Sequence, residues 1–142
     1  MSWLNVPENI EDYHGFIYKI THEPTSIYYI GRCGFWRIEK KKPLKGRVNK
    51  RHVKKETKWR EYYGSSDKFK QFVEEQGRKN FKREMIYWCK NKWEEAYHEA
   101  RLQIENEVLF DEKSMNGIIN LKIPKAPKES MQKYLEDKKR KC

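Results

Sequence analysis

Lysines, arginines and aromatic residues gather in one stretch of the chain, where their types suit the binding of a polyanion. Between Arg37 and Arg60 there are 12 basic residues and two glutamates, so these 24 residues carry a net charge of +10. Such runs bind phosphate backbones by counterion release and do not read base sequence. Trp59, Tyr62 and Tyr63 lie at the end of the stretch and could stack on nucleobases. The stretch therefore predicts a nucleic-acid-binding surface, with a solvated surface loop as the alternative.

The candidate DNA contacts are most of these cations and one aromatic ring. They are Lys40, Lys41, Lys42, Lys45, Lys50, Arg51, Lys54, Lys55 and Trp59. A second basic stretch, residues 122–142, holds eight basic and three acidic residues. The whole chain has a net charge of +11, which makes DNA the expected partner. If six phosphates are contacted, the log–log slope of affinity against salt is about −5.

A membrane partner is not expected. No run of apolar residues approaches the roughly 18 to 20 that a membrane span needs, and the basic stretches lack the apolar face of a membrane-surface helix. Residues 1–7 have neither the basic nor the apolar region of a signal peptide. Three cysteines without a CxxC pair indicate reduced thiols rather than a disulfide framework. We therefore expect a cytoplasmic protein.

Several kinds of enzyme site are absent from the sequence. The four histidines lack the HxxxH or HNH-like spacing of a histidine-ligated metal. No P-loop, GxGxxG or GxSxG motif occurs.

Aromatic residues make up 14% of the 142 residues, which argues for a packed core beneath a charged surface.

Two strands and a turn are expected near the N-terminus. Residues 14–21 and 27–31 are rich in β-branched and aromatic residues, and the five residues between them carry turn chemistry. Residues 35–63 form a basic insert, which we expect to be a loop with a short helix around residues 46–54.

Helices and a third strand are expected in the second half. A short amphipathic helix over residues 66–76 begins after a Gly-Ser-Ser turn and ends at Gly77. Residues 81–89 read as a strand, and Asn91 with Glu94 can cap a long helix. Its expected buried stripe is Trp93, Ala96, Tyr97, Ala100, Ile104 and Val108. Residues 118–123 read as a last short strand, before a basic, partly helical tail.

This order of elements predicts a small single α+β domain with a three-stranded antiparallel sheet flanked by helices. We divide the chain into an N-terminal lead (1–13), the domain (14–120) and a basic C-terminal tail (121–142).

Two tyrosines occupy the expected hairpin in a recognisable pattern. Phe16-Ile17-Tyr18 and Tyr29-Ile30-Gly31 lie on its two strands, with ten residues between the tyrosines. The pair resembles the signature of the GIY-YIG nuclease family, with Phe16 in place of the first glycine. Further resemblances to phage-encoded and homing-endonuclease-like members lie at Tyr63-Gly64-Ser65-Ser66, Phe69, Gly77, Asn80-Phe81, Glu84 and Asn116-Gly117.

The resemblance implies a GIY-YIG-like fold and a DNA endonuclease or nickase that uses one Mg²⁺ ion, with Mn²⁺ as a substitute. Hydrolysis of a phosphodiester needs an activated water, a counter-charge for the transition state and a metal on the leaving side. In the family picture, the tyrosines matching Tyr18 and Tyr29 stand side by side, and the first assists as general base. A tyrosine is a poor base at neutral pH unless a cation lowers its pKa. We expect the basic surroundings to lower the pKa of Tyr18.

The arginine and the acid that the family implies each have more than one candidate. Arg47 fits the family's LxxR pattern, with His52 about one turn later, and Arg32 is the rival for the scissile phosphate. Glu99 and Glu105 are the candidates for holding the metal. They differ by 240° around a helix, so only one can face a given pocket.

Asn116 or Asn120 would be the family's late structural or phosphate-contacting asparagine. A monomer with one site would nick DNA, and double-strand cutting would require a homodimer. The alternative function is a weakly active or inactive DNA-binding module on the same fold. If the protein is phage-encoded, it would work in the cytoplasm of the host cell.

Overall fold

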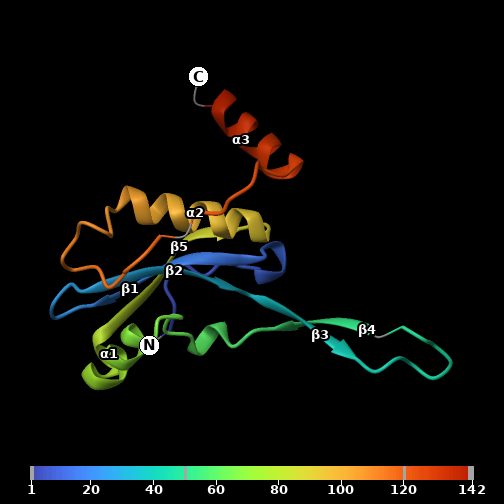
Figure 1. Cartoon of the computed structure of the whole chain (residues 1–142), viewed down its shortest axis with the longest axis horizontal. Helices are drawn as coiled ribbons and strands as arrows, with labels where there is room; N and C mark the ends of the chain where they lie inside the picture. Colours follow the sequence, from blue (N-terminus) through green and yellow to red (C-terminus); the bar gives the residue numbers. More distant parts are fainter. Residues whose placement is uncertain (1, 50, 120, 141–142) are drawn as a thin grey trace.

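The computed structural model describes residues 2–49, 51–119 and 121–140. Its centre is a three-stranded antiparallel sheet in the order β2-β1-β5 (Figure 1). The strands are β1 (Gly15–His22), β2 (Tyr28–Gly34) and β5 (Phe81–Cys89). This sheet and its helices confirm the predicted α+β class.

The two helices that flank the sheet begin at the residues that the sequence predicts. In α1 (Asp67–Gln76), Ser66 Oγ accepts a hydrogen bond from the Phe69 amide at 3.4 Å. In α2 (Lys92–Glu105), Asn91 Oδ1 accepts one from the Glu94 amide at 2.8 Å. Both caps satisfy an amide that has no partner inside its own helix.

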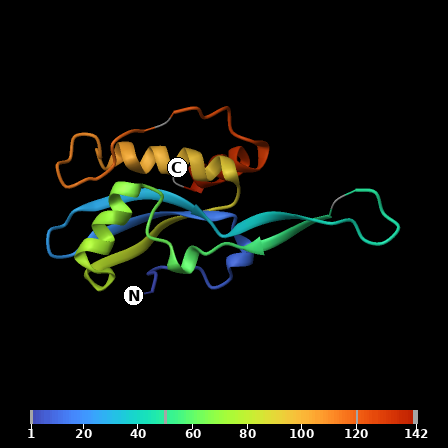
Figure 2. The same ribbon diagram turned by 60° about the horizontal axis from the view of Figure 1, so that its bottom comes forward.

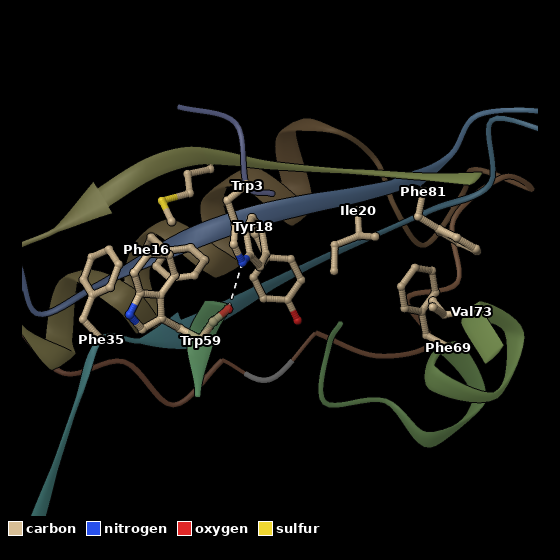
Figure 3. Packing of buried hydrophobic residues seen from close by; sticks show 10 residues of the cluster. Trp3, Phe16, Tyr18, Ile20, Phe35, Trp59, Phe69, Val73 and Phe81 are labelled. Atoms are coloured by element: carbon tan, nitrogen blue, oxygen red, sulfur yellow. Dashed lines mark hydrogen bonds between the residues drawn. The ribbon is translucent and has the colours of Figure 1, made fainter. Parts of the chain in front are cut away.

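The helices cover opposite faces of the sheet, and each face has its own apolar cluster (Figures 1 and 2). On the α1 face, side chains from β1 and α1 pack with aromatic rings from the lead and from the short helix η2 (Trp59–Glu61). The fully or almost fully buried rings there include Trp3, Phe16, Tyr18, Phe35 and Trp59 (Figure 3). The smaller cluster on the α2 face includes Ile17, Ile30 and Val108.

The N-terminal lead is irregular, but it belongs to this core. Trp3 is buried and donates from Nε1 to the carbonyl of Trp59 at 2.8 Å. Leu4 pairs with Glu84 at the outer edge of β5. The lead also contains the short helix η1 (Ile10–Asp12), and η3 (Arg78–Asn80) precedes β5.

The C-terminal tail contains α3 (Lys128–Arg140), which is fixed to the beginning of α2. Ser130 Oγ donates to the Glu94 carboxylate at 2.5 Å, and Asn91 Nδ2 donates to Glu129 at 2.7 Å. The expected partly helical tail is therefore present.

The basic insert differs from the expected loop and helix. It forms β3 (Trp36–Lys41) and β4 (Arg51–Glu56), which pair as a separate antiparallel ribbon. The second half of the expected helix lies in β4, and Gly46 at its start has a φ of +86°, outside the helical region. We call residues 36–56 the arm, since the ribbon projects from the body of the molecule (Figures 1 and 2).

Of two further expectations for the second half, one is wrong and the other is correct only in part. Residues 118, 119 and 121–123 do not form a strand. Of the expected stripe on α2, Ala100 is buried, and so is Val108 beyond the helix, but Tyr97 and Ile104 are exposed, and Glu95 and Gln103 are buried instead. Gln103 is buried because its Nε2 donates to the Ile30 carbonyl of the sheet at 2.9 Å, and Glu95 because it hydrogen-bonds His14, just before β1.

Candidate active site

Tyr18 and Tyr29 lie next to each other on the α1 face of the sheet. Tyr18 pairs with Gly31 across the β1–β2 register, and Tyr29 precedes Gly31 by two residues. Residues two apart on a strand share a face, so both rings project to the same side. Their centroids are 6.3 Å apart. The structure thus brings the two tyrosines together.

The hydroxyl of Tyr18 is enclosed by glycines and tyrosine rings. A Cβ on Gly31 would stand 2.5 Å from Tyr18 Oη, and one on Gly64 would stand 3.5 Å from it. Gly64 has a φ of +103°, in the region that favours glycine. Tyr62 contacts Tyr18 edge-on, with a centroid distance of 5.7 Å. The side chain of Tyr18 is fully buried.

This enclosure changes the expected chemistry of Tyr18. Burial raises its pKa well above the ordinary 10.0, and Tyr62 and Tyr29 raise it further. The expectation of a lowered pKa is wrong, because most cations of the basic insert lie on the arm rather than beside this hydroxyl. Tyr18 Oη makes no hydrogen bond of normal geometry within the described residues. At neutral pH it is a neutral hydroxyl that retains its capacity to bind a polar group.

Glu99 and Arg32 meet on the other face of β2. Arg32 follows Gly31 directly, so its side chain projects toward α2, where its Nε lies 3.8 Å from Glu99 Oε1. Burial raises the pKa of Glu99, and the positive charge of Arg32 opposes this rise. Both side chains are partly exposed. Since β2 is an edge strand, this pair and the tyrosine pair adjoin the same edge of the sheet from opposite faces.

Glu95 is a buried acid that sequence reasoning missed. It lies one helical turn before Glu99 and hydrogen-bonds Nδ1 of His14, the residue just before β1. Burial raises the pKa of Glu95, although its contact with His14 opposes the rise. A Cβ on Gly15 would stand 2.9 Å from its carboxylate. The available signal was the i, i+4 spacing of the two glutamates on one helix face.

The side chain of Asn116 hydrogen-bonds the backbone of β2. Its Oδ1 accepts from the Ile30 amide at 2.9 Å, and its Nδ2 donates to the Ile30 carbonyl at 2.8 Å. Beside it, the Tyr28 amide donates to the Lys113 carbonyl at 2.9 Å, and the Met115 amide donates to the Tyr28 carbonyl at 2.8 Å. Residues 113–116 thereby pair with β2 in the manner of a short extra strand, and the side chain of Asn116 has a structural role. Asn120 lies outside the described residues.

A comparison with known families decides the identity. Residues 3–121 match the family model described as "Putative endonuclease segE, GIY-YIG domain". The chain belongs to the GIY-YIG endonuclease family. Searches of curated proteins and of solved structures found no match.

Within this GIY-YIG domain, the remaining catalytic candidates lie away from the tyrosines. Arg47 is exposed near the tip of the arm, and His52 is exposed on β4. Glu105 lies on the exposed side of α2 and pairs with Arg101 at 2.9 Å. Of the alternatives left open by the sequence, the structure therefore groups Arg32 and Glu99 near the tyrosine-bearing strand.

The candidate DNA contacts on the arm include one correction. Trp59 is only 2% exposed and packs against Phe16 and Phe35, so it cannot stack on bases. The lysines at 40, 45, 54 and 55 belong to the arm, where Lys54 contacts Glu11 and Lys55 contacts Glu39. Lys41 and Lys42 lie at the end of β3 and just beyond it, the side chain of Arg51 is not described, and Lys50 lies outside the described residues.

A cleft of about 390 Å³ borders the tyrosine pair at Tyr62 and Gly64. Lys58, Lys70 and Arg78 line it together with Glu61 and Glu74, and Arg78 pairs with Glu74 at 2.8 Å, so the cleft carries charges of both signs. A larger cleft, about 750 Å³, lies between α2 and α3 and does not include the tyrosine pair. The smaller cleft is thus the one that adjoins the GIY-YIG motif.

Two negative observations concern only the described part of the chain. No group of three or more metal-ligating side chains occurs there. None of the described helices combines the length and apolarity that a membrane span requires.

Proposed function

We propose that this GIY-YIG domain is a Mg²⁺-dependent DNA endonuclease or nickase that hydrolyses phosphodiester bonds along the outer edge of β2. The observation that carries the proposal is the Tyr18 hydroxyl, which is buried beside Tyr29 and, although Tyr62 lies close to it, makes no hydrogen bond of normal geometry within the described residues. An unsatisfied buried hydroxyl costs free energy, and a site for a reacting water or phosphate oxygen gives it a partner.

In this proposal the neutral Tyr18 hydroxyl orients the attacking water by accepting a hydrogen bond from it. This role does not require ionisation, in keeping with the raised pKa. Tyr18 is completely covered, whereas Tyr29 is partly exposed. A phosphate would therefore meet Tyr29 first and reach Tyr18 after a shift of the segment that holds Tyr62 and Gly64.

Arg32 and Glu99 supply the charges in this proposal. Arg32 would bind the scissile phosphate through its guanidinium group, because its side chain is partly exposed at the same edge. Its present partner, Glu99, lies 3.8 Å away, a separation that leaves the guanidinium hydrogen bonds open to a phosphate.

The residues present fit a magnesium ion held by few protein ligands. Glu99 offers a partly exposed carboxylate, and Mg²⁺ commonly binds one or two carboxylates and keeps several waters. When bound, the ion would stabilise negative charge on the leaving oxygen. Glu95 is engaged with His14 and is the less suitable ligand.

A second candidate function is a DNA-binding module that does not cut. The covered Tyr18 hydroxyl and the placement of Glu99 on the opposite face of β2 favour it. In either case, the proposed place of action is the cytoplasm, that of a host cell if the gene is phage-borne. One chain would nick DNA, and a homodimer would be needed to cut both strands.

Plasmid cleavage tests the proposal. Supercoiled DNA is incubated with the wild type, Tyr18→Phe, Glu99→Gln and the control Glu105→Gln, with Mg²⁺ or with a chelator. We expect relaxed product from the wild type and Glu105→Gln in Mg²⁺ alone, and at least about 100-fold less from the other two variants. Binding without cleavage by the wild type, in Mg²⁺ or Mn²⁺, would favour the non-cutting module.

A further inference from the structure

The tip of the arm carries two apolar side chains in water. Val48 is 94% exposed and Leu44 is 51% exposed. They stand among cations, since residues 40–49 contain five lysines and arginines and no acid. Exposed apolar residues at the end of a projecting ribbon gain nothing from the fold, and such groups often mark an interaction site.

The turn at the tip has a defined geometry. The Arg47 amide donates to the Leu44 carbonyl at 2.9 Å, which closes a four-residue turn. Gly46, with a φ of +86°, occupies the third position, as a type II turn requires. A Cβ on Gly46 would meet nothing within 4 Å. The turn therefore places Leu44 and Arg47 at its two ends, with Val48 directly after.

The base of the arm is anchored in the protein core. Phe35, the single residue between β2 and β3, is fully buried and packs against Trp59. Trp36 Nε1 donates to the Tyr13 carbonyl at 2.9 Å, and Lys54 Nζ lies over the Trp36 ring at 4.1 Å. The strand that carries Tyr29 thus continues into the arm (Figure 1).

These features suit the insertion of the arm into a DNA groove. Ribbon-shaped β-elements can enter a groove, and proteins that bind the minor groove often push apolar side chains between base steps. Such a wedge unstacks the step and kinks the duplex by about 20–90°. Arginine, lysine and asparagine side chains commonly contact the minor groove in such proteins. Here Lys45, Arg47 and Asn49 lie next to Leu44 and Val48 in the sequence.

We propose that the arm inserts its tip into the minor groove of duplex DNA, where Leu44 and Val48 wedge open a base step and kink the helix. This inference rests on DNA as the substrate of the proposed function and adds a second site of action on that substrate. Because Leu44 follows Tyr29 by 15 positions, the kink lies within about 50 Å, or about 15 base pairs, of the cut. Pyrimidine–purine steps, which kink most easily, are the preferred points of insertion.

The test measures bending separately from cleavage. A duplex labelled at both ends with a fluorescent donor and acceptor is titrated with the Glu99→Gln chain, which holds the DNA uncut. Two further variants carry this change and either Leu44→Ser with Val48→Ser or Lys45→Gln with Arg47→Gln. Melting curves establish that the variants fold.

We expect energy transfer to rise when the Glu99→Gln chain binds, as the DNA ends approach each other. The apolar variant should bind at least about 10-fold more weakly, keep the salt slope and lose the bend. The charge variant should reduce the steepness of the salt slope by about 2 and keep the bend. Prior saturation of the minor groove with a small-molecule groove binder should abolish the bend.

Three other results would contradict the inference about the arm and leave the proposed nuclease activity unaffected. An unbent duplex in the bound complex, an undiminished bend with the apolar variant, or a bend that survives a blocked minor groove would each do so. Failure to bind duplex DNA, by contrast, would overturn both the inference and the proposed nuclease. Conversely, a bend that depends on Leu44 and Val48, from a chain whose wild type cuts no DNA, would support the arm and refute the nuclease.

Discussion

The Tyr18 hydroxyl lies so close to Gly31 that a Cβ on this glycine would stand 2.5 Å from Oη. Gly31→Ala should therefore push the Tyr18 ring out of place and destabilise the fold by about 1–3 kcal/mol. Urea unfolding measures this change. Gly117→Ala is the matched control, since its Cβ would meet nothing within 4 Å. Equal stability of the two variants would contradict the close approach.

Removal of the Tyr18 hydroxyl should reduce cleavage activity without lowering the stability of the fold. Because Oη has no hydrogen bond of normal geometry in the described structure, Tyr18→Phe should leave the free energy of unfolding at pH 7 unchanged or raise it. Cleavage should nevertheless fall about 10²- to 10⁴-fold. A variant that unfolds easily and loses activity for that reason would contradict the assignment.

The same variant should alter stability in alkali. The unfolded chain ionises Tyr18 near its ordinary pKa of 10.0, while burial keeps the folded tyrosine protonated. The unfolded state then binds fewer protons, so the free energy of unfolding falls as the pH rises. Between about pH 9 and 11, Tyr18→Phe should lose less stability than the wild type. The exposed Tyr134→Phe serves as the control, and an unchanged slope in Tyr18→Phe would argue against burial of a neutral hydroxyl.

The loss of cleavage activity at low pH, the acid limb of the pH profile, should depend on the ionisation of Glu99. Burial raises the pKa of this carboxyl and Arg32 opposes the rise, so Arg32→Gln should raise the pKa further. If ionised Glu99 holds the metal, activity in the variant will be lost at a higher pH than in the wild type. A profile of kcat/KM from about pH 4 to 8 measures the shift. Arg101→Gln, which removes the partner of Glu105, should leave the limb in place, and a shift there would point to Glu105 instead.

Asn116 offers a test of the support for β2. In Asn116→Asp, Oδ1 can still accept from the Ile30 amide, but the carboxylate meets the Ile30 carbonyl in place of a donor. We expect a loss of about 1–3 kcal/mol in urea unfolding. Asn106→Asp, at the exposed end of α2, should change stability by less. Similar losses in both variants would show that Asn116 has no special hold on the strand.

Helices and strands whose ends are marked by nearby residues could be predicted from the sequence. Ser66 and Asn91 cap helices where expected, and the strand over 81–89 has the predicted bounds. The tyrosine pair also follows from sequence, because hairpin register alone brings Tyr18 and Tyr29 to one face. In each case, residues close in the chain determine the outcome.

The expectations that proved wrong concern features that depend on contacts between residues far apart in the sequence. The arm is a ribbon because β3 and β4 pair with each other, and Glu39 and Lys55 contact across it, which no single stretch reveals. The orientation of α2 depends on polar groups in the sheet, such as the Ile30 carbonyl that accepts from Gln103. The burial of Glu95 depends likewise on His14, 81 residues away.

The closed edges of the central sheet limit how two copies could join. An open edge strand can pair with another chain and extend the sheet. Here residues 113–116 occupy backbone groups of β2, and Leu4 occupies those of β5, with its amide 2.9 Å from the Arg83 carbonyl. Two molecules therefore cannot merge their sheets at these positions. A pair that cuts both DNA strands would have to assemble through other parts of the molecule, such as the arm or the helices, or through the DNA itself.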